Sequence, residues 1–331
     1  MIIKTVKLTN FRNHSKYVLE CKDSTSLILG ENGCGKTSVL EAIYIVSRGK
    51  SFRAVDADIL KRGEEFYRVE VEYCSGEKAV VVYDGESKTF LIDDKKTKRL
   101  SKKNKYPVVL FLPSDLNLMS SSPTSRRDYF DRVFGQFDAM YGVSLSKYEK
   151  ALKQRNELLK KEYLKPDEVF YWNLLLAKYG MEVVSKRKAF LTEINQKLTE
   201  VYQSIAENED TVQIELETMV DGDENGYIKA LESDFERDRI LGHTRFGVHK
   251  DDFIFKFNEK IANGSASRGE VRSIILALKF IEAEMLKKKL GQNPIVLLDD
   301  VFSELDETRR RCLVKNFRDN QVIITSVESI E

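Results

Sequence analysis

Three short segments of the chain carry residue types that suit the chemistry of a nucleoside triphosphate. The first is a glycine-rich loop followed by a basic residue and hydroxyls, Gly30-Glu31-Asn32-Gly33-Cys34-Gly35-Lys36-Thr37-Ser38. Glycines at this spacing let successive backbone N–H groups turn toward a phosphate, and a following helix adds its positive end. Lys36 can reach the β- and γ-phosphates, and the Thr37 hydroxyl suits Mg²⁺. The loop therefore predicts a site for ATP and Mg²⁺.

The second segment is an apolar run that ends in two carboxylates, Ile295-Val296-Leu297-Leu298-Asp299-Asp300. We expect a buried strand whose carboxyl end faces the ligand crevice of a parallel sheet. Asp299 would hold Mg²⁺ through water, and Asp300 would polarise the attacking water, because phosphoryl transfer depends on positioning and charge neutralisation. Lys36 and Asp300 are thus the predicted catalytic residues. The alternative, a strand followed by a solvated acidic turn, is disfavoured by the phosphate loop in the same chain.

The third segment, Ser267-Arg268-Gly269-Glu270, precedes a long helical pattern. One interpretation is a helix start that grips the γ-phosphate bound to a second copy of the chain. The other is an ordinary capping box, which is compatible with the first. Glu304 and Asp306 fit a loop that packs across such a dimer. A phosphate loop, a large insert, a Ser-x-Gly-Glu helix start and an acidic strand end follow each other in the order typical of an ABC-type ATPase head.

The elements that position these segments can be read from the spacing of apolar residues. Tyr67 to Tyr73 alternates apolar and charged residues, which predicts a half-exposed antiparallel strand. Residues 123–159 and 169–205 repeat apolar residues every three or four positions around Pro166, which predicts a helical hairpin with arms of roughly 50–60 Å. Further strands are expected at residues 80–83, 89–92, 108–112, 212–216, 252–257, 295–298 and 322–325. The fold class is α/β: an ABC-type ATPase head with a mixed sheet and an antiparallel β lobe, formed by residues 1–113 and 240–331, with an inserted α-helical hairpin lobe at 114–239.

The formal net charge of the chain is only +1, so a surface for nucleic acid must be a local patch. Seven of the eleven residues from 95 to 105 are basic. They could contact DNA phosphates without sequence preference, and a solvated hairpin turn is an equal alternative. The candidate DNA contacts are Lys95, Lys96, Lys98, Arg99, Lys102, Lys103, Arg126 and Arg127. His249 could line the interface of a closed dimer, although its spacing favours a hydrogen-bonded structural histidine, and Phe130 to Phe137 is expected in the core.

Four scattered cysteines, without a CxxC pair, argue against zinc and against a disulfide framework, and favour a reducing cytosol. No apolar run approaches the roughly 20 residues that cross a bilayer, and the first residues have no signal-peptide core. The expectation is a cytoplasmic protein without a membrane partner.

Several longer stretches resemble the RecF family of recombination mediator ATPases, and the resemblance runs nearly end to end. They are Leu8-Thr9-Asn10-Phe11-Arg12-Asn13, the phosphate loop, Ser51-Phe52-Arg53, Lys153-Gln154-Arg155-Asn156, Gly247-Val248-His249-Lys250-Asp251-Asp252 and Asp299-Asp300-Val301-Phe302-Ser303-Glu304-Leu305-Asp306. The family usually carries Ser-Gln-Gly-Gln at the third segment and a proline at position 248. In the nucleotide site we also place Arg12 and Asn13; Arg12 and Arg53, near the phosphate loop in sequence, could serve nucleotide or DNA.

The resemblance implies a weak DNA-stimulated ATPase of recombinational repair and replication. ATP would drive a homodimer together on double-stranded DNA beside single-strand gaps, and hydrolysis would release it. It also implies work with the RecO and RecR mediators, which load recombinase on single-stranded DNA. Two alternatives belong to other classes. An SMC-like structural tether needs far longer coiled-coil arms than residues 123–209 provide, and the Asn10–Asn13 start and the Asp299-Asp300 pair speak against the ATPase subunit of a transporter.

Overall fold

The computed structural model describes residues 2–92 and 95–327, which form two compact units. Unit 1 is built from both ends of the chain, up to Leu116 and again from Lys279 onward, and unit 2 is Asn117–Leu278. The sequence predicted that the inserted lobe ends at residue 239, whereas unit 2 extends to Leu278. The reason is aromatic packing within that unit: the rings of Phe130 and Phe253 stack with centroids 4.2 Å apart.

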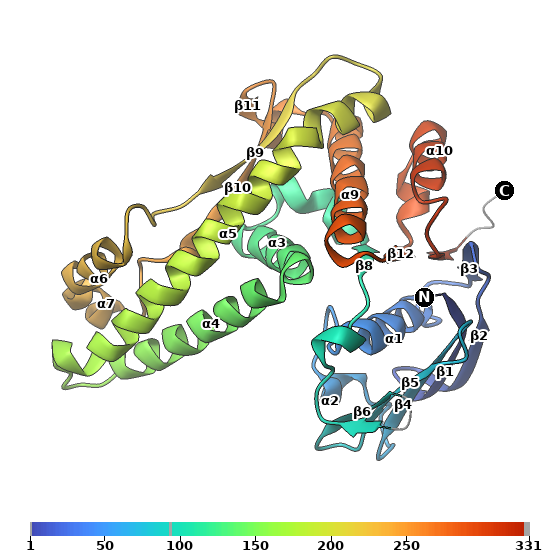
Figure 1. The fold of residues 1–331 in the computed structure, drawn as a ribbon, viewed down its shortest axis with the longest axis horizontal. Helices are drawn as coiled ribbons and strands as arrows, with labels where there is room; N and C mark the ends of the chain where they lie inside the picture. The colour runs from blue at the N-terminus through green and yellow to red at the C-terminus, as the bar shows by residue number, and fades with distance from the viewer. Residues whose placement is uncertain (1, 93–94, 328–331) are drawn as a thin grey trace. The chain divides into compact units, whose positions relative to one another are not determined.

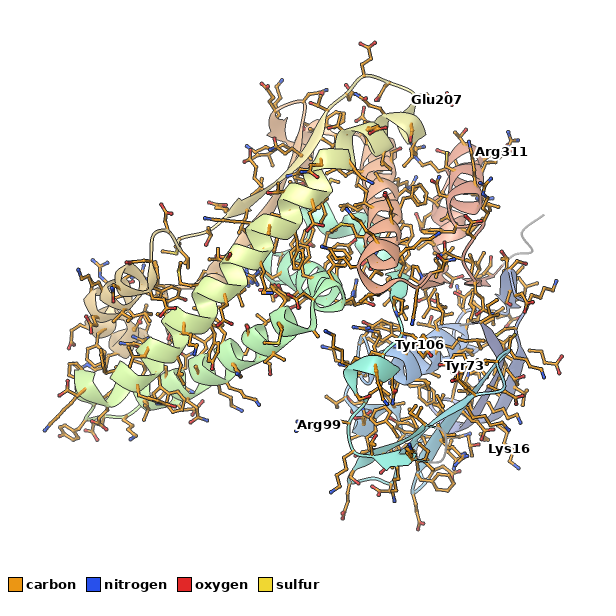
Figure 2. All side chains as sticks on the ribbon, in the orientation of Figure 1. Lys16, Tyr73, Arg99, Tyr106, Glu207 and Arg311 are labelled. Carbon is orange, nitrogen blue, oxygen red and sulfur yellow. The ribbon has the colours of Figure 1, made fainter. Side chains whose placement is uncertain are left out.

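Unit 1 contains two sheets of different character (Figure 1). The antiparallel sheet has the order β2-β1-β4-β5-β6-β7. Its strands are β1 (Ile3–Phe11), β2 (His14–Glu20), β4 (Tyr67–Tyr73), β5 (Lys78–Tyr83), β6 (Lys88–Ile92) and β7 (Lys95–Thr97). The alternation predicted for 67–73 is confirmed, since β4 alternates strictly between buried and half-buried residues. On its buried face, Tyr73 lies against Tyr106 with ring centroids 5.4 Å apart (Figure 2).

The second sheet of unit 1 is parallel and has the order β3-β13-β12-β8. Its strands are β3 (Thr25–Leu29), β8 (Val108–Phe111), β12 (Ile295–Asp299) and β13 (Val322–Ser326). Every residue of β12 is buried, as its apolar composition predicts for a strand covered on both faces. Its carboxyl end therefore carries Asp299 and Asp300 to the same edge at which β3 leads into the glycine-rich loop.

Helix α1 (Lys36–Arg48) contacts strands of both sheets, including β1, β4, β12 and β13. Being covered on both sides, it is buried almost all round, from Ser38 through Ser47. The remaining short elements of unit 1 are α2 (Asp56–Ile59), α10 (Glu307–Asn316) and the 3-10 turns at Lys102–Asn104 and Val301–Glu304. A further 3-10 turn, Pro113–Ser120, and the long helix α9 (Arg268–Leu290) each contribute residues to both units.

Unit 2 is organised around a helical hairpin, in which α4 (Ala139–Leu159) and α5 (Pro166–Ala206) run side by side (Figure 1). The predicted first arm was one segment from 123 to 159, and that is wrong. It is divided into α3 (Pro123–Phe137) and α4, because Asp138 is extended and its side chain caps α4 at Met140. Phe130, Phe134 and Phe137 are buried, as expected. The other elements are β9 (Val212–Glu217), α6 (Glu224–Ser233), α7 (Phe235–Leu241), the 3-10 turn Val248–Lys250, β10 (Asp252–Phe257), β11 (Lys260–Ile261) and α8 (Ala262–Ser265).

All four cysteines lie within the described residues and none forms a disulfide. Across 2–92 and 95–327, the structure contains no helix with the length and apolarity that crossing a bilayer requires.

Candidate nucleotide-binding site

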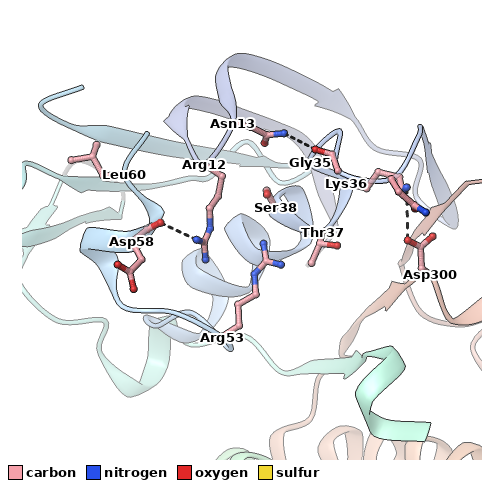
Figure 3. Close-up of a pocket in the computed structure, with 12 residues that line it drawn as sticks. Arg12, Asn13, Gly35, Lys36, Thr37, Ser38, Arg53, Asp58, Leu60 and Asp300 are labelled. Atoms are coloured by element: carbon pink, nitrogen blue, oxygen red, sulfur yellow. Dashed lines mark hydrogen bonds and ion pairs between the residues drawn. The ribbon is translucent and has the colours of Figure 1, made fainter. Parts of the chain in front are cut away.

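A cavity of about 430 Å³ opens in unit 1 at the start of α1 (Figure 3). Its walls come from four parts of the chain that are far apart in sequence. The lining residues are Arg12, Asn13, Asn32, Gly33, Gly35, Lys36, Thr37, Ser38, Arg53, Asp58, Leu60 and Asp300. Most of the residues predicted for the nucleotide therefore share one cavity, together with Asp300; of the predicted loop, Gly30, Glu31 and Cys34 are not in its lining. Asp58 and Leu60 also line the cavity, although no sequence motif predicted them.

The loop is shaped by left-handed backbone at Gly33 (φ 83°) and Gly35 (φ 103°). Gly35 caps α1 and lies close to the turn after β1: the Asn13 amide donates to the Gly33 carbonyl at 3.2 Å, and a His14 ring nitrogen lies 3.1 Å from the Gly35 carbonyl. A Cβ on Gly35 would stand 2.4 Å from both Asn13 Oδ1 and His14 Nε2. Glycine is thus required at this position by conformation and by space.

Lys36 is buried and its ammonium group is directed back across the loop. Its Nζ donates to the carbonyl of Gly30 at 2.7 Å and to that of Glu31 at 3.2 Å, and lies 3.8 Å from Asp300 Oδ2. Asp300 has a left-handed backbone (φ 51°), and its N–H donates to Thr325 Oγ1 at 3.0 Å. The bend after β12 therefore aims the Asp300 carboxylate at the ammonium group, as Figure 3 shows.

Thr37 and Asp299 meet beside this pair. The Thr37 hydroxyl lies 2.8 Å and 3.0 Å from the two Asp299 carboxylate oxygens, and Thr325 Oγ1 donates to Oδ1 of the same group at 2.9 Å. Among the described residues there is no cluster of three or more His, Cys, Asp or Glu side chains that could hold a metal unaided. A hydroxyl beside a carboxylate nevertheless fits Mg²⁺, which takes oxygen ligands and usually completes its shell with water and substrate phosphate.

Arg12 and Arg53 also line the cavity, and both donate to one carboxylate that does not line it, Glu41 of α1. Arg12 also donates to the Asp58 carbonyl at 2.8 Å (Figure 3). Burial alone would raise the pKa of Glu41, but hydrogen bonds from Arg12, Arg53 and Ser51 lower it below the ordinary value. No sequence motif predicted a role for Glu41, although it is the one acidic residue of α1 and lies between apolar residues.

The remaining predicted site residues lie outside the cavity lining. Ser267 and Glu270 form the expected capping box at the start of α9: the Ser267 N–H donates to Glu270 Oε2 at 2.5 Å, and the Glu270 N–H to Ser267 Oγ at 3.3 Å. This segment belongs to unit 2, and Ser267 and Arg268 are exposed. In unit 1, Glu304 and Asp306 are exposed, and the Asp306 side chain caps α10.

The candidate DNA contacts fall into two groups. The first, which we term the basic segment, consists of Lys95, Lys96, Lys98, Arg99, Lys102 and Lys103. All six side chains are exposed, Arg99 visibly so in Figure 2, and none pairs with a carboxylate among the described residues. The second group is engaged within unit 2: Arg126 forms a bidentate ion pair with Asp252, and Arg127 donates to the Asp251 carbonyl at 2.7 Å.

Comparison with known proteins places the whole chain in one family. A sequence profile described as "RecF/RecN/SMC N terminal domain" matches residues 2–330. "DNA replication and repair protein RecF" of Ruminiclostridium cellulolyticum is 34% identical over 98% of this chain and 92% of its own length. The protein of the same name from Staphylococcus carnosus is 33% identical over 100% of this chain and 95% of its own.

Solved structures give the same result. A RecF–ATP structure described as the recombination mediator of the RecFOR pathway superposes with a TM-score of 0.87 at 28% identity, covering 100% of this chain and 93% of that one. The Smc head domain of Pyrococcus furiosus, at 14% identity and a TM-score of 0.51 over 99% of this chain and 90% of its own, shares the fold alone. A phosphate loop, an acidic strand end and end-to-end similarity thus agree: the chain belongs to the RecF family of DNA replication and repair ATPases.

Proposed function

We propose that this chain is an ATP-controlled DNA-binding switch of recombinational repair. ATP binding joins two copies on double-stranded DNA near a single-strand gap, and hydrolysis separates them. The observation that carries the proposal is the cavity at the start of α1, where Lys36, the Thr37–Asp299 pair and Asp300 meet. These are the cation, the metal-binding oxygens and the carboxylate that phosphoryl transfer needs in one place.

In the proposed mechanism each side chain has one task. Lys36 exchanges its two carbonyl partners for the β- and γ-phosphates. Thr37 and Asp299 would hold Mg²⁺, which neutralises developing charge on the phosphates when bound. Asp300 orients and polarises the attacking water. Arg12 and Asn13 bind the nucleotide from the turn after β1.

The proposed dimer follows from the Ser267–Glu270 segment. Its residues Ser267 and Arg268 are exposed at the N-terminus of a long helix, and the segment is absent from the lining of the cavity. Backbone N–H groups at such a helix start favour an anion. We therefore propose that this segment binds the γ-phosphate held by a second copy, with Glu304 and Asp306 facing the partner. The glutamate at 270 sets this contact apart from the family's usual glutamine.

For DNA we retain the basic segment as the contact surface. Its six exposed cations have no carboxylate partner among the described residues, so phosphates can pair with them with release of counterions. Arg126 and Arg127 are already bound within unit 2 and are a weaker choice. The RecO and RecR mediators and a recombinase are proposed partners through family membership. Four unpaired cysteines fit the proposed cytoplasmic location.

The test measures ATP turnover and light scattering of the purified chain with duplex DNA, single strands or lipid vesicles. We expect stimulation by duplex DNA, and an ATP-dependent rise in mass to that of a dimer. Lys36→Met should abolish both. Turnover that ignores DNA would instead favour another ABC-type machine, and an SMC-like tether is disfavoured by the short hairpin of α4 and α5. Protein that stays monomeric at saturating ATP and duplex DNA refutes the proposal.

A further inference from the structure

Glu41 has an unusual environment for a carboxylate in a helix. Its side chain is 0% exposed, and it accepts hydrogen bonds from three residues that lie before and after α1. Arg12 donates through Nε at 2.9 Å and Nη2 at 2.8 Å, Arg53 through Nε at 3.1 Å and Nη2 at 2.9 Å, and Ser51 through Oγ at 2.6 Å. A buried charge with this many partners is stabilised only while those partners stay in place.

The three donors belong to the segments that frame the cavity. Arg12 follows β1 with a left-handed backbone, and its N–H donates to the Ile59 carbonyl at 2.8 Å. Ser51 also accepts from the N–H groups of Arg53 and Ala54, which fixes the turn after α1. Glu41 itself is not in the cavity lining, whereas Arg12 and Arg53 are. Any influence of Glu41 on a ligand is therefore exerted through the two arginines.

The two guanidinium groups are held closer together than their charges favour. Arg12 Nε and Arg53 Nε both donate to the same oxygen, Glu41 Oε2. Without that oxygen, two like charges would repel and the more exposed Arg53, at 38% against 22% for Arg12, would turn into solvent. Figure 3 shows the Arg53 guanidinium pointing toward the first turn of α1, where Thr37 and Ser38 lie. Its Nη1 has no hydrogen-bond partner among the described residues.

We propose that Glu41 is a positioning residue for the nucleotide: it holds Arg12 and Arg53 as a fixed pair whose free N–H groups face the phosphates. The inference rests on the proposed nucleotide site. It adds a residue that does not touch the ligand and yet sets its affinity. Preorganised arginine donors bind phosphate oxygens in two-point geometry, and that geometry is lost once either guanidinium can rotate away.

Two substitutions distinguish the effect of the charge of Glu41 from the effect of its side-chain length. Glu41→Gln keeps the length and removes the charge, and Glu41→Asp keeps the charge and is one methylene too short to reach both arginines. If Glu41 acted only as a nearby negative charge, Glu41→Gln would bind ATP more tightly. If it positions the arginines, both variants weaken ATP binding. We expect the Kd for a fluorescent ATP analogue to rise at least tenfold in each, about 1.4 kcal/mol.

A matched control is available in the same unit. Glu72 of β4 also lies near two cations, 3.7 Å from Lys4 and 3.8 Å from Lys78, and is absent from the cavity lining. Glu72→Gln should bind ATP like the unmodified chain. Duplex-stimulated turnover gives a second readout: with the arginines misplaced, KM for ATP rises about tenfold while kcat stays within about twofold. A partly unfolded preparation does the opposite, because it lowers kcat and leaves KM unchanged.

Arg53→Ala tests the proposal even if the Glu41 variants do not fold, because it leaves Glu41 paired with Arg12. Arg53→Ala should itself raise the Kd for ATP. Adding Glu41→Asp to it should then cost less than Glu41→Asp costs alone, because the two residues act through one contact. Equal or tighter ATP binding by Glu41→Gln, or fully multiplicative effects of Glu41→Asp and Arg53→Ala, overturns the proposal while leaving the nucleotide site intact. An unmodified chain that binds no ATP overturns the site and the proposal together.

Discussion

The packing of the phosphate loop against the turn after β1 predicts different costs for two alanine substitutions that look alike in sequence. Gly33 and Gly35 both have left-handed backbone, at φ 83° and 103°. An alanine in that region costs about 1–2 kcal/mol. A Cβ on Gly33 meets no atom within 4 Å, so Gly33→Ala should cost only this backbone strain.

Gly35→Ala carries a second cost. Its Cβ would stand 2.4 Å from Asn13 Oδ1 and from His14 Nε2, so both side chains must move. Moving them breaks the contacts of Asn13 with the Gly33 carbonyl and of His14 with the Gly35 carbonyl, at about 0.5–1.5 kcal/mol each. The total is about 2–5 kcal/mol, against about 1–2 kcal/mol for Gly33→Ala.

The two variants are compared by titration with a fluorescent ATP analogue and by thermal unfolding. If the loop keeps its shape, the extra cost of about 1–3 kcal/mol appears as lower stability of Gly35→Ala. If the loop relaxes without nucleotide, the same cost appears as an ATP Kd about 5- to 150-fold above that of Gly33→Ala. Equal affinity and equal melting temperature in both variants would refute the reasoning that Asn13 and His14 leave no room for a side chain at position 35.

Three further predictions test other parts of the chain. Asp300→Asn should still bind ATP and form the dimer, but its kcat should fall at least about 100-fold, which is about 2.7 kcal/mol of transition-state stabilisation. An unchanged kcat would show that Asp300 has no part in the mechanism. Replacing the six cations of the basic segment by glutamine should weaken the binding of duplex DNA and make its affinity depend less on salt. Fluorescence anisotropy at several ionic strengths measures both effects. An equal loss of affinity at every salt concentration would contradict phosphate contacts. Burial lowers the pKa of His249 to about 4, so the unfolded chain binds the extra proton between about pH 6.5 and pH 4 and stability should fall as the pH is lowered through that window. Thermal unfolding of His249→Gln should show a flatter profile over the same range.

The parts of the fold that sequence could predict are those with local signals. The alternation of residues 67–73 gave β4 with its observed bounds, and residues 252–257 gave β10. The break at Asp138 was missed, because the apolar spacing continues through it, whereas the extended backbone of Asp138 and its capping contact with Met140 are seen only in the structure. The extent of unit 2 was also missed, since the stacking of Phe253 on Phe130 joins residues more than a hundred positions apart.

In the candidate site, too, the residues with a local sequence signal were predicted and those without one were not. The loop from Gly30 to Thr37 and the Asp299-Asp300 pair were predictable, because each motif needs a fixed local spacing to do its chemistry. Glu41 was not, although it lies only five positions after Lys36. A single glutamate between apolar residues is compatible with a solvated face, and the role we propose for it depends on two arginines whose positions are set by the turn after β1 and by Ser51. Nothing in the periodicity of α1 shows that both of its faces are covered by sheets, which is the condition that buries the carboxylate and makes paired arginines necessary. The proposed ligand-binding loop could thus be predicted from a local motif, whereas the proposed positioning role of Glu41 could be inferred only once the packing around α1 was known.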